Sequence, residues 1–221
     1  MRTRGKSAMT QKTALLLPVM TGQPVIPVIR IEQLAHAVPL ARALAKGGLP
    51  AIEITLRTPV ALDAIRAVAS EVEDAVTGAG TILNAKQFEQ AVEAGSKFIV
   101  SPGTTPQVIK AAAGSDVPLL PGAVTSSEIM AALEQGYSLL KFFPAEQAGG
   151  AAYLKSLSSP FAGVRFCPTG GVSEKNAPIY LGLPNVLCVG GSWVAPDELV
   201  RDGKWAEIEA LARQASGLAR R

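Results

Sequence analysis

The stretch VIPVIR at residues 25–30, followed by QLAHAVPLARALAK at 33–46 and AIEITL at 51–56, decides the fold. The first and third segments are short and apolar, as buried strands are, whereas the middle segment repeats apolar residues at helical spacing. A strand, a helix and a second strand in this order form a unit whose two strands run parallel.

The same alternation continues along the chain. Further strands are predicted at 75–80, 98–101, 118–121, 139–143, 164–168 and 186–190, and further helices at 59–71, 85–94, 106–113 and 126–135. Eight strands alternating with helices predict the α/β class and a closed (β/α)8 TIM barrel with a parallel eight-stranded sheet. An open, doubly wound sheet is the alternative, but no G-x-G-x-x-G sequence follows the first strand.

The length of the chain predicts one domain. No linker rich in Pro, Gly or Ser divides the 221 residues, so we expect a single barrel domain over 1–221, with residues 1–22 as an N-terminal extension. This extension joins basic residues to a short apolar stretch, but Pro18 interrupts the stretch and no small-residue cleavage pattern follows. We therefore expect a soluble, cytoplasmic protein with no membrane partner.

Charge and residue usage narrow the function. The net charge of +3 is scattered without a basic stripe, so we expect a small anionic substrate and no nucleic-acid partner. Cys167 and Cys188 each lie in an apolar run, which predicts reduced core thiols. His36 is the only histidine and lies in an amphipathic pattern, so it is interpreted as a surface or packing residue. We expect neither a metal nor a cofactor.

Lys141 lies inside the apolar segment LLKFFP at 139–144. A charged lysine is costly to desolvate there, and a neutral amine on a barrel strand is the nucleophile that imine formation needs. The structural alternative is a lysine that reaches solvent at a strand edge, but a closed barrel has no free edge.

Glu53 is a second charge in a buried strand. Because side chains alternate, Glu53, Thr55 and Arg57 share one face, with Arg57 about 13 Å nearer the mouth of the barrel. A carboxylate near Lys141 suits general acid/base work, and a structural ion pair with Arg57 or Lys141 is the alternative. Arg57 offers a planar fork for a substrate carboxylate, to which Thr81 can add a hydroxyl.

Two glycine-rich strand ends suggest a phosphate site. The segments TGG at 169–171 and GGS at 190–192 offer backbone N–H groups at neighbouring strand ends, where many barrels bind phosphate. Plain tight turns are the alternative interpretation. Arg30, at the end of the first strand, is placed to supply a counter-charge.

At these residues the sequence resembles the 2-keto-3-deoxy-6-phosphogluconate (KDPG) aldolase family, which is also described as bifunctional with 4-hydroxy-2-oxoglutarate (KHG) aldolase. The matching segments are EITLRT at 53–58, GAGT at 78–81, SPG at 101–103, KFFPAE at 141–146, RFCPTGG at 165–171 and GGSW at 190–193, with VIPVIR also similar. The resemblance implies a lyase that cleaves KDPG to pyruvate and glyceraldehyde 3-phosphate, and KHG to pyruvate and glyoxylate. It also implies a homotrimer that needs no metal.

The resemblance further implies a role for each motif. Lys141 is then the Schiff-base lysine and Glu53 the acid/base. The residues that line the pyruvate pocket are Arg57, Thr81, Pro102 and Phe143, and those that hold the phosphate are Gly170, Gly171, Gly191 and Ser192.

Three other interpretations remain open. One is an aldolase for the galactonate-derived C4 epimer, and another is a different phosphate-binding barrel, such as a thiamine phosphate synthase or a phosphosugar isomerase. The third is a phosphate-binding barrel without catalysis, which would be favoured if Lys141 or Glu53 were replaced. Both residues are present.

Overall fold

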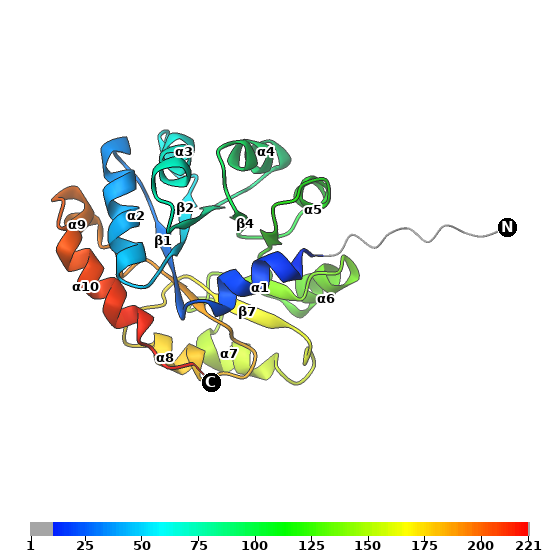
Figure 1. Ribbon diagram of the computed structural model, residues 1–221. Helices are drawn as coiled ribbons and strands as arrows, with labels where there is room; N and C mark the ends of the chain where they lie inside the picture. The colour runs from blue at the N-terminus through cyan, green and yellow to red at the C-terminus, as the bar shows by residue number, and fades with distance from the viewer. Residues whose placement is uncertain (1–10, 221) are drawn as a thin grey trace.

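The computed structural model describes residues 11–220, in which parallel strands alternate with helices (Figure 1). The strands are β1 (Val25–Ile29), β2 (Ala51–Thr55), β3 (Val76–Gly80), β4 (Phe98–Val100), β5 (Leu119–Leu120), β6 (Leu139–Phe142), β7 (Arg165–Pro168) and β8 (Val189–Gly191). The helices are α1 (Thr13–Thr21), η1 (Leu34–His36), α2 (Ala37–Lys46), α3 (Ala61–Glu71), α4 (Ala85–Glu93), α5 (Pro106–Ala113), α6 (Ser126–Glu134), α7 (Gly150–Ser156), α8 (Ala177–Leu181), α9 (Asp197–Arg201) and α10 (Trp205–Ser216). The predicted α/β class with parallel strands is confirmed.

The strands pair in two groups. One sheet has the order β5-β4-β3-β2-β1-β8, the other joins β6 to β7, and the pairs within both are parallel. Isolated parallel bridges connect the groups, between Gly122 and Lys141 on one side and between Thr169 and Gly190 on the other. The pairing therefore differs from the single eight-stranded ladder expected from the sequence. One cause is Pro121, which follows β5 and has no N–H to donate to a ladder.

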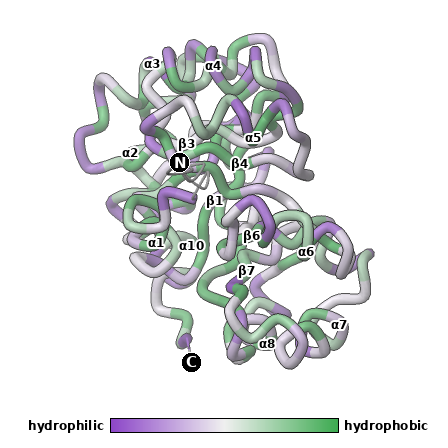
Figure 2. Tube along the Cα trace, turned by 90° about the vertical axis from the view of Figure 1, so that its right-hand side faces the viewer, coloured by the Kyte–Doolittle hydropathy of each residue, from purple (hydrophilic) through white to green (hydrophobic). Residues whose placement is uncertain are grey.

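Side-chain alternation divides the core into an outer and an inner part. On β2, Ile52 and Ile54 pack in the outer cluster between the strands and the helices, whereas Ala51 belongs to an inner cluster. The inner cluster also takes residues from β1, β4, β5, β6 and β7. The residues of β4 are hydrophobic in Figure 2, whereas α3, α4 and α5 alternate between hydrophilic and hydrophobic segments, as helices with one solvent-facing side do.

Helix α1 lies within the expected N-terminal extension, where the sequence analysis predicted no helix. The stretch taken as part of an N-terminal extension forms a helix despite Pro18, and Leu16 and Met20 are fully buried in the inner cluster. Residues 1–10 of the expected extension lie outside the described part of the chain.

Two buried glutamines fix α1 to the strands. The Gln11 amide donates to the Leu119 and Leu139 carbonyl oxygens at 3.1 and 2.8 Å and accepts from the Leu139 N–H at 2.9 Å. Gln23 does the same for β1 and β2, where it donates to Val25 O and Ala51 O and accepts from Ala51 N–H. Because these are the first residues of their strands, α1 covers the amino ends of the strands and leaves their carboxyl ends open.

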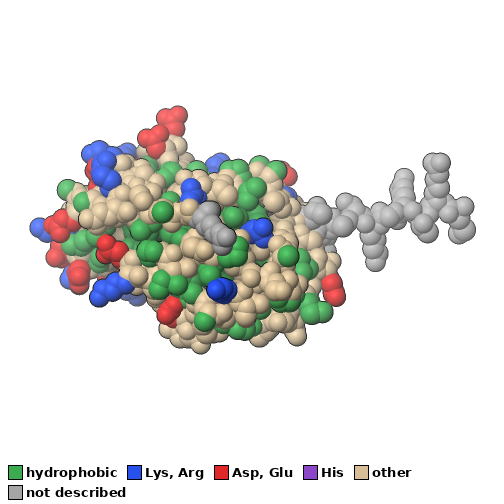
Figure 3. Space-filling model, turned by 90° about the horizontal axis from the view of Figure 1, so that it is seen from below, with side chains coloured by type: hydrophobic (Ala, Val, Ile, Leu, Met, Phe, Trp, Pro, Cys, Tyr) green, Lys and Arg blue, Asp and Glu red, His purple; other side chains and the backbone are tan. Residues whose placement is uncertain are grey.

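None of the helices in the described residues is long and apolar enough to cross a membrane. On the face seen in Figure 3, acidic and basic side chains are interspersed, many of them on the side of α2, α9 and α10. The described side chains on this face form no continuous basic band.

Candidate active site

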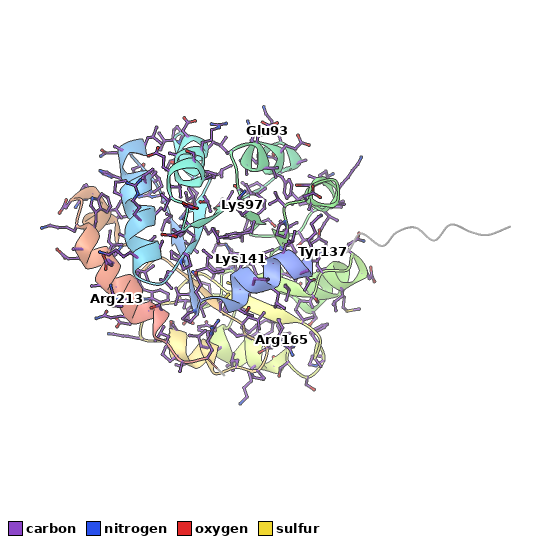
Figure 4. All side chains as sticks on the ribbon, in the orientation of Figure 1. Glu93, Lys97, Tyr137, Lys141, Arg165 and Arg213 are labelled. Carbon is purple, nitrogen blue, oxygen red and sulfur yellow. The ribbon has the colours of Figure 1, made fainter. Side chains whose placement is uncertain are left out.

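Lys141 on β6 and Glu53 on β2 meet inside the curved sheet, where Lys141 lies near the centre of the molecule in Figure 4. Lys141 Nζ lies 3.2 Å from Glu53 Oε1, and both residues are buried, at 5% and 3% exposure. The alternative of a lysine reaching solvent at a strand edge is therefore wrong. A buried amine that touches a buried carboxylate can exchange a proton with it directly.

Gly80 makes room for the carboxylate. It pairs in register with Thr55, and a Cβ added at Gly80 would lie 2.0 Å from Glu53 Oε1. The GAGT segment is therefore more than a glycine-rich turn, because any side chain at its second glycine would displace Glu53. The sequence analysis took Thr81 from this segment and missed Gly80.

Arg57 is held on the face that strand alternation predicted. Its Nε donates to Thr55 Oγ1 at 2.9 Å, and Thr55 Oγ1 donates to the Ile29 carbonyl oxygen at 2.9 Å. Thr55 is buried, whereas Arg57 is exposed. The buried hydroxyl thus connects β1 to the guanidinium at the open end, and the sequence analysis gave Thr55 no role.

Phe143 lies at the end of β6, beside Lys141. The lysine Nζ is 5.2 Å from the centre of the Phe143 ring, a cation–π distance. Gly170 adopts φ +97°, and a Cβ there would approach the Phe143 ring to 3.1 Å. The ends of β6 and β7 are further joined by the Ala145 N–H, which donates to Thr169 O at 2.8 Å. Gly170 therefore lies next to the aromatic ring that packs over Lys141.

The other predicted pocket residues lie at the ends of neighbouring strands. Thr81, after β3, has φ +60°, the only positive φ of a non-glycine residue in the described chain. Pro102 follows β4, and its carbonyl oxygen would lie 2.2 Å from a Cβ at Gly122. Because β4, β3 and β2 are parallel neighbours, Thr81 and Pro102 lie at the carboxyl ends of the strands, as Arg57 does.

Arg30, Arg57 and Ser192 line one cavity of about 290 Å³, together with Asp197. Ser192 follows β8, next to β1 in the sheet. Gly191 has a steric role as well, because a Cβ there would lie 1.8 Å from the Trp193 ring. The end of β8 thus joins the two arginines in one open pocket.

Glu146 supports the second glycine of the TGG segment. A Cβ at Gly171, which has φ +75°, would lie 2.6 Å from Glu146 Cγ, and the Glu146 N–H donates to Gly170 O at 3.1 Å. The Tyr180 hydroxyl donates to Glu146 Oε1, and burial, together with this hydrogen bond and the carboxylate charge, raises the pKa of Tyr180 well above its usual range. The sequence analysis quoted Glu146 only as the end of KFFPAE and gave it no role, and it did not single out Tyr180.

The cysteines and the histidine have packing roles. Cys167 and Cys188 are free and buried, as predicted, and the hydrogen bond with Cys167, helped by burial, raises the pKa of the Cys188 thiol. His36 packs edge-on against Trp205, with ring centroids 5.6 Å apart. Between residues 11 and 220, no three His, Cys, Asp or Glu side chains are grouped so that they could hold a metal ion.

The fold and the site define a class of protein, the α/β enzymes in which a buried lysine beside a carboxylate is suited to imine chemistry. The chain belongs to the KDPG and KHG aldolase family, whose model matches residues 17–211. It is 49% identical over 197 residues to the KHG/KDPG aldolase of Escherichia coli K12, covering 89% of this chain and 92% of that protein.

Solved structures agree with this membership. The KDPG aldolase of Legionella pneumophila, with pyruvate captured as a covalent carbinolamine intermediate, has a TM-score of 0.88 and 46% identity over 90% of this chain and 97% of that one. The 2-keto-3-deoxy-6-phosphogluconate aldolase of Zymomonas mobilis with 3-phosphoglycerate has a TM-score of 0.88 and 50% identity, covering 94% and 97% of the two chains.

Proposed function

We propose that this protein is a class I aldolase that cleaves KDPG to pyruvate and glyceraldehyde 3-phosphate, with KHG as a second substrate. The observation that carries the proposal is the 3.2 Å contact between the buried Lys141 Nζ and Glu53 Oε1. The family membership and the relatives that hold pyruvate and 3-phosphoglycerate support it.

Imine formation begins with proton transfer from Lys141 to Glu53, which leaves a neutral amine. The amine attacks the C2 ketone of KDPG to give a carbinolamine, and the proton held by Glu53 leaves with the C2 hydroxyl as water. The resulting iminium withdraws electrons from C3. The first transfer uses the contact between the two side chains, and the second passes from the Glu53 carboxyl group to the substrate oxygen.

Bond cleavage uses the same carboxylate as a base. Glu53 takes the proton of the C4 hydroxyl, the C3–C4 bond breaks, and its electron pair moves toward the iminium nitrogen. Glyceraldehyde 3-phosphate leaves, and an enamine of pyruvate remains on Lys141. Protonation of the enamine at C3 and hydrolysis of the imine release pyruvate and restore the amine.

The remaining site residues bind the substrate in this proposal. Arg57 and Thr81 hold the C1 carboxylate, which matches the planar fork of a guanidinium. Pro102 and Phe143 pack against the pyruvate carbon atoms. The phosphate lies at Gly170, Gly171, Gly191 and Ser192, with Arg30 as counter-charge.

We also propose that the two strand groups close as one eight-stranded barrel, that the active protein is a homotrimer and that it is cytoplasmic. Closure is supported by the bridges at both junctions and by an inner cluster to which most of the strands contribute.

Reduction with borohydride tests the proposal, because it converts an imine into a stable secondary amine. Incubation with pyruvate and sodium borohydride is expected to give a pyruvate adduct on Lys141, located by mass spectrometry of peptides. Lys141→Ala is expected to lose the adduct, whereas Lys97→Ala, at an exposed lysine, keeps it. No adduct on folded wild-type protein would exclude imine catalysis.

A further inference from the structure

The phosphate end of the proposed pocket contains a carboxylate that the reaction does not use. The cavity at the ends of β8, β1 and β2 is lined by Arg30, Arg57, Ser192 and Asp197. A substrate phosphate beside Ser192 must therefore lie in the same cavity as the Asp197 carboxylate. Two like charges in one small cavity oppose each other.

Arg30 is held between two carboxylates that differ in position. Its Nε lies 3.1 Å from Glu32 Oε1, and its Nη2 lies 3.2 Å from Asp197 Oδ2. Glu32 lines a neighbouring cavity of about 240 Å³, whereas Asp197 lines both cavities. Glu32 therefore holds the Arg30 guanidinium from outside the cavity that Arg57 and Ser192 line. Asp197 contacts the Nη2 end of the same guanidinium from within that cavity.

We propose that Asp197 determines substrate specificity by competing with the substrate phosphate for Arg30, an inference that rests on the proposed function. In the free protein Asp197 occupies Nη2 of Arg30, while Glu32 pairs with Nε. A phosphorylated substrate must displace this carboxylate, while Glu32 keeps Nε in place. A substrate without phosphate has no group that replaces the Asp197 carboxylate at Arg30. Asp197 therefore weakens the binding of phosphorylated substrates only, and so makes the preference for them smaller.

The expected size of the effect follows from exposure. The side chains of Arg30 and Asp197 are 43% and 75% exposed, so solvent screens their attraction. Removing the charge of Asp197 is therefore expected to change the preference for phosphorylated over unphosphorylated substrate by about three- to fivefold, the upper part of the range that an exposed ion pair allows.

The measurement is the ratio of kcat/KM for KDPG to kcat/KM for 2-keto-3-deoxygluconate, which differs only in lacking the phosphate. Asp197→Asn is expected to raise this ratio about three- to fivefold, mainly through a lower KM for KDPG. Asp202→Asn is the matched control. Asp202 is an exposed acid that directly follows helix α9, pairs with Arg201 and does not line the cavity. An unchanged or lower ratio in Asp197→Asn would overturn the proposal.

Two further variants identify Arg30 as the shared partner. In an Arg30→Gln background, Asp197→Asn is expected to raise the ratio by less than half as much as in the wild type, and an equal rise would show that Asp197 acts without Arg30. Glu32→Gln is expected to lower the ratio, because Arg30 loses the carboxylate that holds its Nε.

Borohydride trapping of pyruvate on each variant separates failure of this inference from failure of the proposed function. If wild-type protein traps pyruvate and cleaves KDPG while the ratio stays constant among variants, only the role of Asp197 is wrong. If folded wild-type protein does neither, the aldolase proposal fails, and the competition at Arg30 fails with it.

Discussion

At the scale of single residues, the position of Glu53 depends on Gly80. Gly80→Ala would place a Cβ 2.0 Å from Glu53 Oε1, so the carboxylate must leave its position beside Lys141. We expect kcat for KDPG cleavage to fall by about 10²-fold or more, the lower end of what a general acid/base contributes. Coupled detection of pyruvate measures the rate.

Gly163→Ala is the matched control, because the space around a Cβ at Gly163 is open. Its kcat is expected to equal that of the wild type. Wild-type activity in folded Gly80→Ala would contradict the placement of Glu53 as the acid/base.

Residue chemistry also explains how far the sequence predicted the site. Lys141 and Glu53 were identifiable because a charge inside an apolar strand is unusual, and strand alternation pointed to Arg57 on the same face as Glu53. The roles of Gly80 and Glu146 were not identifiable, because they depend on contacts between segments that meet only in three dimensions. No pattern along the chain reports that a Cβ at Gly80 would meet a side chain on β2.

At the scale of elements, α1 stabilises the amino ends of the strands. Leu16 is fully buried in the inner cluster, so Leu16→Ala is expected to lower the free energy of unfolding by about 2–5 kcal/mol through lost burial and a cavity. Leu15, on the same helix, is 55% exposed, and Leu15→Ala is expected to change the free energy of unfolding by less than about 0.5 kcal/mol. Urea titrations followed by circular dichroism measure both, and equal effects would show that α1 does not pack as described.

The sequence predicted helix α5 but not helix α1. The helix at 106–113 was predicted with its observed bounds, since Thr105 caps it and Pro106 begins it. At residues 13–21, Pro18 was used only to argue against an export signal, and no helix was predicted there. The sequence could not reveal that the inner cluster buries Leu16 and Met20 and outweighs the hydrogen bond that proline removes.

At the scale of the whole molecule, we expect a trimer in solution. Large apolar side chains remain exposed on the single chain, among them Leu83 at 57%, Met130 at 55% and Ile179 at 62%. Burying such side chains is what drives association between subunits. Sedimentation equilibrium is expected to give the mass of three chains, and a monomer at micromolar concentration would contradict the proposed assembly.

The cover that α1 places over the amino ends of the strands has a kinetic consequence. Substrate and products must use the same opening at the carboxyl ends, and in the proposed reaction the pyruvate half is bonded to the deeper Lys141 while the aldehyde half lies outside it. The aldehyde must therefore depart before pyruvate can, so release is strictly sequential. Added pyruvate should then inhibit competitively against KDPG, and added glyceraldehyde 3-phosphate should inhibit noncompetitively.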